Sequence, residues 1–202
     1  MANTKKIVSV CAVFLLTSFA LLHSWAGVEW GPESREDIMF LANSMKDSEW
    51  TPNATFTNYG WAGGNNKTYY AGTIYRGVPY TQGNPQDSLT DFLLLIRNTS
   101  GGWQGSGYGN DCSGFASICW RLTARQVTST FGSGIGSYWD SLGPNGSAKS
   151  TDTVKLIEGD ALNSVSGGHI ILFNRYISGG IESVEQTPWN VQNRIWKYAN
   201  LE

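Results

Sequence analysis

The chain has little charge, little histidine and little cysteine. Only 15% of its 202 residues are charged, 14 of them basic and 16 acidic, whereas about a quarter is usual. This near-neutral balance argues against a nucleic-acid partner, which would require a basic surface. Beyond residue 26 the chain has one histidine and two cysteines seven residues apart, which cannot make a zinc site. We therefore expect no metal and no other cofactor.

Glycine and aromatic residues are abundant instead. The chain has 24 glycines, and aromatic side chains make up 13% of it. So many aromatic residues in a chain of low net charge can bury a core, which excludes disorder as the main state. At about 150 residues per domain, the length predicts one domain of ordinary size.

A long apolar run lies at the N-terminus. Lys5 and Lys6 precede an uncharged stretch, 7–22, and small residues stand at positions 24 and 26. This pattern predicts a secretory signal peptide over residues 1–26. The run is shorter than the 18 or so apolar residues of a membrane anchor. We expect a secreted protein, extracellular or at the cell wall, without a stable membrane span after cleavage; a retained anchor is the alternative.

Removal of residues 1–26 leaves few reactive side chains. The remaining chain has 12 basic and 16 acidic residues, a net charge of −4, and keeps Cys112, Cys119 and His169. The two cysteines lie seven residues apart in a segment with helical apolar spacing. A helix would separate them by about 10 Å, and a disulfide spans at most about 7 Å. We expect no disulfide between them, and a core position for Cys119.

Helices are predicted in the first half of the remaining chain. A serine, an acid three residues later and apolar residues at helical spacing predict helices over 34–47 and 88–97. The segment 50–75 lacks a helical period and predicts loops and short extended pieces. A glycine-rich loop, 98–110, precedes a third helix that begins at Cys112.

Strands are predicted towards the C-terminus, after a glycine- and serine-rich surface excursion over 131–150. Short segments rich in β-branched and aromatic residues lie at 157–160, 169–176, 181–187 and 191–198. With a turn region over 174–180, they predict an antiparallel meander. Helices that precede strands, without βαβ alternation, indicate the α+β class.

Cys112 and His169 can form a nucleophile and its base. The first turn of a helix favours the thiolate form of a cysteine through its unpaired N–H groups and its dipole. His169 follows two glycines and opens an apolar run, which would fix its backbone on a strand. A cysteine at a helix start and a histidine on a packed strand are typical of an activated thiol. The alternative is an inert cysteine and a histidine that only packs.

Three local sequences resemble a known family. They are Asp111-Cys112-Ser113-Gly114-Phe115, then Gly159-Asp160, then Gly168-His169-Ile170-Ile171-Leu172-Phe173. Together they resemble the NlpC-type cysteine peptidases, secreted papain-like enzymes of bacterial cell-wall metabolism. The resemblance covers about 78–190. It implies a papain-like α+β fold, with N-terminal helices, the nucleophile at a helix start and a C-terminal antiparallel sheet. It also implies a catalytic domain over 78–202, with 27–77 as an extension packed on it.

The resemblance implies a role for each residue of the site. Cys112 would attack a peptide carbonyl, and His169 would move the proton. Glu185 on the next strand would orient the imidazole, with Gln186 as the alternative, because strand alternation sends the two to opposite faces. Many relatives use histidine at this third position, and this chain has none there. Ser178 and Asn174 are weaker candidates.

Substrate-binding residues follow from the same resemblance. Val78-Pro79-Tyr80 fits the tyrosine at the cleft wall, although 32 residues separate Tyr80 from Cys112. Tyr80 and the backbone N–H of Cys112 are candidate oxyanion donors. Asp111 and Ser113 would line the substrate site, where an acid can meet an amino terminus. A core ring for Tyr80 and a helix cap for Asp111 are the alternatives.

The sequence thus predicts a monomeric, metal-independent secreted cysteine peptidase. It would hydrolyse an amide bond in the peptide stems of peptidoglycan through a thioester. N-acetylmuramoyl amide cleavage and transpeptidation on the same scaffold are alternatives. A non-catalytic cell-wall binding module is another, in which aromatic residues in polar, glycine-rich settings stack on sugars: Trp61, Trp103, Trp139, Trp189, Tyr69 and Tyr70. Packing under a loop is favoured for each of these side chains.

Overall fold

The computed structural model describes most of the chain after residue 33. The described segments are 34–58, 66–83, 85–98, 107–133 and 156–201, and they belong to one compact unit. The predicted signal peptide over 1–26 and most of the predicted surface excursion over 131–150 lie outside them. Within the described segments, no helix has the length and apolar character needed to cross a membrane.

Two of the helices begin at the predicted serine caps. Helix α2, Arg35–Asp47, starts after Ser34, whose Oγ accepts the backbone N–H of Asp37 at 3.1 Å. Helix α3, Leu89–Arg97, starts after Ser88, whose Oγ accepts the N–H of Asp91 at 3.0 Å. These side chains satisfy N–H groups that a helix start leaves unpaired.

Four short strands lie between these helices in the sequence, as predicted for 50–75. Strand β1, Glu49–Trp50, pairs with β4, Tyr75–Arg76; β2, Phe56–Asn58, pairs with β3, Lys67–Tyr69. Their aromatic rings surround Trp50, with centroids 4.9 to 6.3 Å from its ring: Phe56, Tyr69, Tyr75 and, from α3, Phe92. The pairs are stabilised through this aromatic cluster, because strands this short have few ladder hydrogen bonds.

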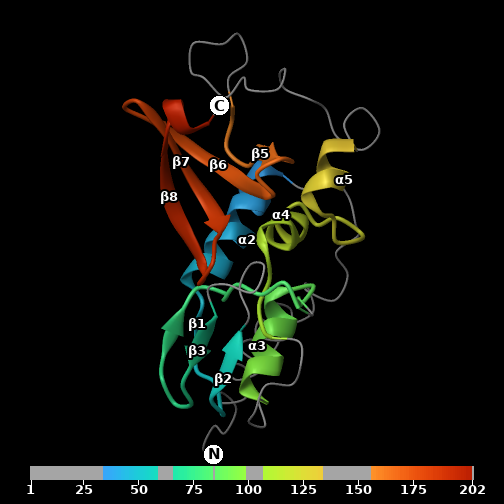
Figure 1. Ribbon diagram of the computed structural model, residues 1–202, viewed down its shortest axis with the longest axis vertical. Coiled ribbons are helices and arrows are strands. Elements are labelled where there is room, and N and C mark those ends of the chain that lie inside the picture. Colours follow the sequence, from blue (N-terminus) through green and yellow to red (C-terminus); the bar gives the residue numbers. More distant parts are fainter. Residues whose placement is uncertain (1–33, 59–65, 84, 99–106, 134–155, 202) are drawn as a thin grey trace, which may run out of the picture. The chain divides into compact units, whose positions relative to one another are not determined.

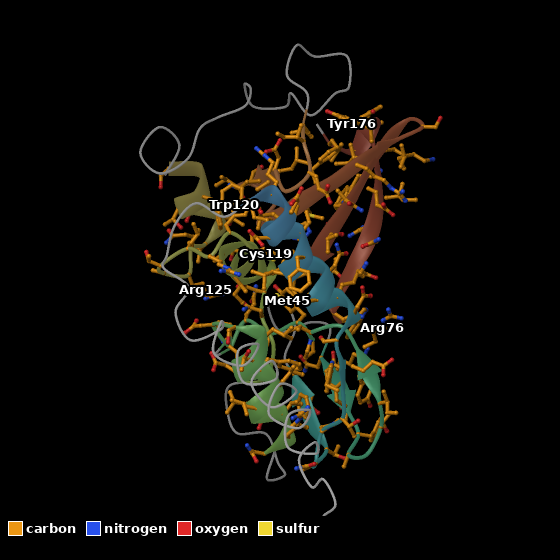
Figure 2. All side chains as sticks on the ribbon, turned by 180° about the vertical axis from the view of Figure 1, so that it is seen from behind. Met45, Arg76, Cys119, Trp120, Arg125 and Tyr176 are labelled. Carbon is orange, nitrogen blue, oxygen red and sulfur yellow. The ribbon has the colours of Figure 1, made fainter. Side chains whose placement is uncertain are left out.

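Helix α4, Cys112–Cys119, lies in the main core. Its Phe115, Ala116 and Cys119 are fully buried and share one apolar cluster with Met45 of α2 (Figure 2). Cys112 and Cys119 are both free thiols, which confirms the expectation of no disulfide between them. Helix α5, Thr128–Ser133, follows and buries Phe131. The predicted excursion is therefore wrong at its start, because Phe131 packs against Trp120.

The C-terminal part is a four-stranded antiparallel sheet. Its strands are β5, Ala161–Ser164, β6, His169–Ile177, β7, Gly180–Gln186, and β8, Val191–Lys197, followed by a short 3-10 helix, Tyr198–Asn200. They pair in sequence order, β5-β6-β7-β8 (Figure 1). The fold is therefore α+β with a C-terminal antiparallel meander, as predicted.

Side chains of the sheet alternate between two apolar clusters. Ile170, Leu172 and Val184 join the core formed with α2 and α4. Ile171 and Phe173 join a second cluster on the other side, which includes Ile181. This alternation follows from the two-residue period of a strand.

Two boundaries of the predicted meander are wrong. The segment 157–160 is a turn, in which the N–H of Asp160 donates to the carbonyl of Ile157 at 3.0 Å and Gly159 has a φ of +86°; the strand begins at Ala161. The predicted turn region 174–180 is mostly strand, because β6 continues to Ile177. A register shift between Phe173 and Arg175 accommodates the extra residue, so only residues 178–179 turn.

Candidate active site

Asp111 determines how helix α4 begins. Its Oδ1 accepts the backbone N–H of Gly114 at 2.7 Å, which makes Asp111 the N-cap and Cys112 the first helical residue. The sulfur therefore lies at the positive end of the helix dipole. Only 5% of Cys112 is exposed.

Two glycines allow the backbone to pack tightly around this helix start. A Cβ on Gly114 would overlap the amide oxygen of Asn110. Gly109 has a φ of +113°, and a Cβ there would overlap the carbonyl of Pro79. The Asn110 side chain is itself fixed, because its Nδ2 donates to the carbonyl of Gln86 at 2.7 Å. The nucleophile is therefore held by backbone and amide contacts on several segments.

His169 lies between a thiol and a carboxylate. Its Nε2 is 3.2 Å from Oε2 of Glu185. Burial lowers the pKa of His169, but hydrogen bonds to the side chains of Cys112 and Glu185 and the charges of both raise it to about 9. The sulfur also lies 3.7 Å from the carbonyl oxygen of Gly168.

Glu185 is fully buried and contacts two further donors. The indole Nε1 of Trp196 donates to Oε2 at 3.2 Å, and Nη1 of Arg194 lies 3.5 Å from Oε1. The guanidinium of Arg194 stacks over the Trp196 ring, 4.5 Å from its centroid. Both carboxylate oxygens thus have a partner on strand β8. A buried carboxylate is stabilised by such hydrogen-bond partners.

The other candidates for the third position lie elsewhere. Gln186 faces the opposite side of β7, and its Nε2 donates to the carbonyl of Val78 at 3.1 Å. Asn174 donates to Glu182 at 2.9 Å, and Ser178 lies in the hairpin turn. Of the four candidates, the structure brings Glu185 to the imidazole.

Tyr80 lies on a short segment next to the helix start. It forms a bridge with Asn110, and its N–H donates to the carbonyl of Trp189 at 3.1 Å. Nε2 of Gln82 donates to the Tyr80 hydroxyl oxygen at 3.0 Å, so the hydroxyl proton can point elsewhere. Burial, followed by the charges of Cys112 and Asp111, raises the pKa of Tyr80 far above its usual range. Tyr80 is therefore a protonated donor close to the thiol.

Asp111 and Ser113 are both engaged within the protein. The hydroxyl of Ser113 donates to Oδ1 of Asp111 at 3.1 Å. Oδ2 of Asp111 pairs with Nη2 of Arg125, in the loop after α4. Both carboxylate oxygens of Asp111 therefore have partners within the protein.

Sequence reasoning missed four residues around the site: Gln82, Arg125, Arg194 and Trp196. The two on β8 are two residues apart and share a face with Glu185 across the β7–β8 ladder. Strand alternation could have placed 194 and 196 on one face, but the register that brings them to Glu185 is not in the local sequence. Gln82 and Arg125 lie in loops and have no periodic signal.

Three of the aromatic residues considered for sugar stacking lie in the described segments, and of these Tyr70 is 61% exposed. Tyr69 is buried, and its hydroxyl donates to the carbonyl of Trp189 at 2.7 Å, so it packs under a loop as predicted. Trp189 is 40% exposed, with Nζ of Lys67 5.5 Å from its ring centroid. Trp61 and Trp103 lie outside the described segments, as does Trp139.

A pocket lies apart from the thiol. It lies next to β1 and α3, and none of the site residues lines it. The lining residues are Glu49, Trp50, Thr51, Ile74, Leu93, Ile96 and Arg97. Its lining has one acid and one base at an otherwise mainly apolar wall, and no nucleophile or histidine. This pocket therefore does not pair a thiol with an imidazole.

Comparison with known proteins leaves the function to be argued from this site. No protein-family model, no curated protein and no solved structure matches the chain. Function is carried by the arrangement of specific residues. Here that arrangement is a thiol at a helix start, an imidazole and a buried carboxylate.

Proposed function

We propose that the chain is a secreted, papain-like cysteine hydrolase that cleaves an amide bond in the peptide stems of peptidoglycan. The observation that carries this proposal is the position of His169, whose Nε2 lies 3.2 Å from Oε2 of Glu185 and whose pKa is raised by both Cys112 and Glu185. A thiol, a base and a group that orients the base are the parts that nucleophilic amide cleavage requires. The peptidoglycan substrate rests on the resemblance of the Asp-Cys-Ser-Gly and Gly-His sequences to NlpC-type peptidases.

The first half of the reaction forms a thioester. The thiolate of Cys112 attacks the carbonyl carbon of the amide, and the carbonyl oxygen becomes an oxyanion. His169, protonated because its pKa is raised to about 9, gives its proton to the leaving amine. The C–N bond breaks, the amine departs, and the acyl group remains on sulfur.

The second half returns the free enzyme. Neutral His169 takes a proton from water, and the resulting hydroxide attacks the thioester carbon. The carbon–sulfur bond breaks, the acid product leaves, and Cys112 and His169 regain the thiolate and imidazolium. Glu185 keeps the imidazole oriented throughout, because its carboxylate is held by Trp196 and Arg194.

Oxyanion stabilisation is assigned to two donors. The backbone N–H of Cys112 belongs to the unpaired first turn of α4, and the Tyr80 hydroxyl keeps its proton. Donors aimed at the developing charge are usually a large catalytic contribution, and the loss of one typically costs 100-fold or more, about 3 kcal/mol.

The test is digestion of purified peptidoglycan, with fragments identified by mass. We expect the protein and a Cys119→Ala variant to release the same fragments, and Cys112→Ala to release none. Cys119 is the matched control because it is a thiol of the same helix, fully buried in the core. A new amino terminus at the second or a later stem residue would identify peptide cleavage, whereas a free lactyl carboxylate together with a free amine on the first stem residue would identify amidase cleavage instead. Intact sacculi that bind both the protein and Cys112→Ala would overturn the proposal in favour of a binding module.

A further inference from the structure

Trp189 has a backbone conformation that a tryptophan rarely adopts. It lies in the turn between β7 and β8 and has a φ of +116°. A residue with a side chain is strained in this region, and glycine is not. Such strain persists where the surrounding structure holds it, and it clusters at binding and active sites. The turn therefore keeps a tryptophan at a position that favours glycine.

Hydrogen bonds to the Trp189 carbonyl oxygen hold the strained turn. This oxygen accepts the backbone N–H of Tyr80 at 3.1 Å and the hydroxyl of Tyr69 at 2.7 Å. Both bonds use the backbone of residue 189, so a glycine at this position would accept them equally well. They account for the conformation of the turn, but not for its indole side chain.

Core packing does not account for the indole ring either. Trp189 is 40% exposed and belongs to neither apolar cluster of the described segments. Beside it lies Lys67, whose Nζ is 5.5 Å from the Trp189 ring centroid and 5.1 Å from that of Tyr69. An aromatic side chain of this size that is both strained and exposed indicates a binding role.

Trp189 and Lys67 together offer two kinds of contact. An indole face packs against the C–H groups of a sugar ring, and an ammonium group has three donors for hydroxyl and amide oxygens. The ring quadrupole attracts the ammonium, so the cation–π contact keeps the two side chains next to each other. This combination fits a sugar with an acetamido group better than an apolar peptide side chain, which has no acceptor for the ammonium.

The backbone connects this pair to the proposed active site. Tyr80, whose N–H donates to Trp189, also forms a bridge with Asn110, two residues before Cys112. Neighbouring strands lie about 4.8 Å apart, so two such steps place the backbone of Trp189 about 10 Å from that of Asn110. Three extended residues span about 10 Å. A sugar at Trp189 and a bond at Cys112 can therefore belong to one substrate when the bond lies early in the stem.

We propose that Trp189 and Lys67 form a glycan subsite, which binds a sugar ring of peptidoglycan while the attached stem peptide reaches Cys112. Trp189 stacks on the sugar ring, and Lys67 donates to its oxygens. This inference rests on the proposed function for the identity of the substrate. Its test is separable, because sugar binding is measured without cleavage.

The first experiment asks whether the indole is there for stability. Urea denaturation is measured for the unaltered protein, Trp189→Gly and Trp189→Ala. We expect the midpoint of Trp189→Gly to be at least as high as that of the unaltered protein, because glycine relieves the strain. Trp189→Ala should have the lowest midpoint, since it loses the ring and keeps the strain. A Trp189→Gly midpoint well below that of the unaltered protein would show that packing retains the ring, and would overturn the inference.

The second experiment measures sugar binding by titration calorimetry. The ligand is a chitin tetrasaccharide, which has acetamido sugars and no peptide. We expect its Kd to rise about tenfold in Trp189→Gly, because the stacking face is lost, and by a smaller factor in Lys67→Gln. Phe40→Ala is the matched control, since Phe40 is an aromatic residue of α2 that is 59% exposed, and its Kd should not change. Absence of binding, or an equal Kd in Trp189→Gly, would refute the subsite.

The third experiment compares free stem peptides with stems still attached to the glycan. We expect the unaltered protein to have a lower KM for the attached stems, and the ratio of the two KM values to fall towards one in Trp189→Gly. Cleavage with the same KM for both substrates would eliminate the subsite while the hydrolase stands. If neither substrate is cleaved but tetrasaccharide binding depends on Trp189, the hydrolase fails and the glycan subsite stands.

Discussion

At the scale of single residues, the site depends on a buried carboxylate on β7. Glu185 is one of two adjacent polar residues that the sequence offers for the third position, and strand alternation correctly separates them onto opposite faces. What the sequence could not show is why a charged group is stable there. The reason is the pair of donors on β8, Trp196 and Arg194, and their approach depends on strand register and sheet twist.

Glu185→Gln should lower kcat/KM by about 100-fold or more, and Glu185→Ala by at least as much, because the imidazole loses the charge that orients it and supports its protonated form. Glu182→Gln is the control, since Glu182 lies on the same strand and pairs with Arg175 at 2.7 Å. Steady-state kinetics on peptidoglycan fragments would measure both. Equal losses for the Glu185 and Glu182 variants would remove Glu185 from the catalytic set.

The pH dependence of activity follows from the same residue contacts. Because the pKa of His169 is raised to about 9, we expect kcat/KM to fall on the alkaline side with a midpoint near pH 9. Above it, the imidazole has no proton for the leaving amine. In Glu185→Gln the alkaline midpoint of the residual activity should lie at a lower pH, because one of the groups that raise the pKa of His169 is gone. An alkaline midpoint that stays the same in both proteins would contradict this assignment.

At the scale of elements, the caps and periods of the sequence predicted helices α2, α3 and α4, but neither helix α5 nor the loops. Ser34, Ser88 and the start of α4 were predictable because capping side chains act within three or four residues of themselves. The strand predicted at 157–160 was wrong because Gly159 adopts a positive φ, which local apolar content does not reveal. The ion pair of Arg125 with Asp111 joins residues fourteen apart in the sequence through a loop, so no local pattern indicated it.

Gly114 tests how tightly the start of α4 is packed. Gly114→Ala should lower the free energy of unfolding by about 2 to 3 kcal/mol, because its Cβ would overlap the Asn110 side chain. Gly72→Ala, at a φ of +73° with nothing within 4 Å, should cost only the backbone strain of about 1 kcal/mol. Chemical denaturation of both variants would measure this.

The double variant Asn110→Ala with Gly114→Ala should recover part of the loss, since the clash is removed with its partner. If the losses in the free energy of unfolding of the two single variants simply add in the double variant, the overlap with Asn110 is not the cause of the Gly114→Ala loss. The rate of Cys112 alkylation in the same variants would show whether the thiol moves with the helix start.

At the scale of the whole molecule, the described chain has one main core to which early and late segments both contribute. Met39, Ala42 and Met45 of α2 are buried in the same cluster as Phe115 of α4 and Leu172 of β6. The division of the chain at residue 78 stays a prediction, since it came from the extent of a sequence resemblance. Because the core includes residues on both sides of position 78, removal of the preceding residues tests this division.

A chain that begins at residue 78 should not fold on its own. It would lose three fully buried side chains of α2 and the aromatic cluster around Trp50, and each large core side chain removed costs about 2 to 5 kcal/mol. Against a total stability of about 5 to 15 kcal/mol, this is enough to unfold it. Circular dichroism with a cooperative thermal transition would measure the outcome. A folded 78–202 fragment in which a thiol reagent still alkylates Cys112 rather than Cys119 would show that 27–77 is a separate extension.

The stability of the whole molecule should also depend on pH through His169. A histidine whose pKa rises from 6.5 to about 9 on folding stabilises the protein fully below pH 6.5, and this contribution is lost as the pH rises through 9. The contribution is at most about 3 kcal/mol, at about 1.4 kcal/mol for each pH unit. Urea unfolding measures the free energy of unfolding at pH 6 and at pH 9.5. This free energy should decrease more between the two pH values in the unaltered protein than in His169→Gln. The decrease should be intermediate in Cys112→Ala, which removes one of the groups that raise the pKa of His169. Identical decreases in all three proteins would show that Cys112 and Glu185 do not raise the pKa of His169 in the folded protein.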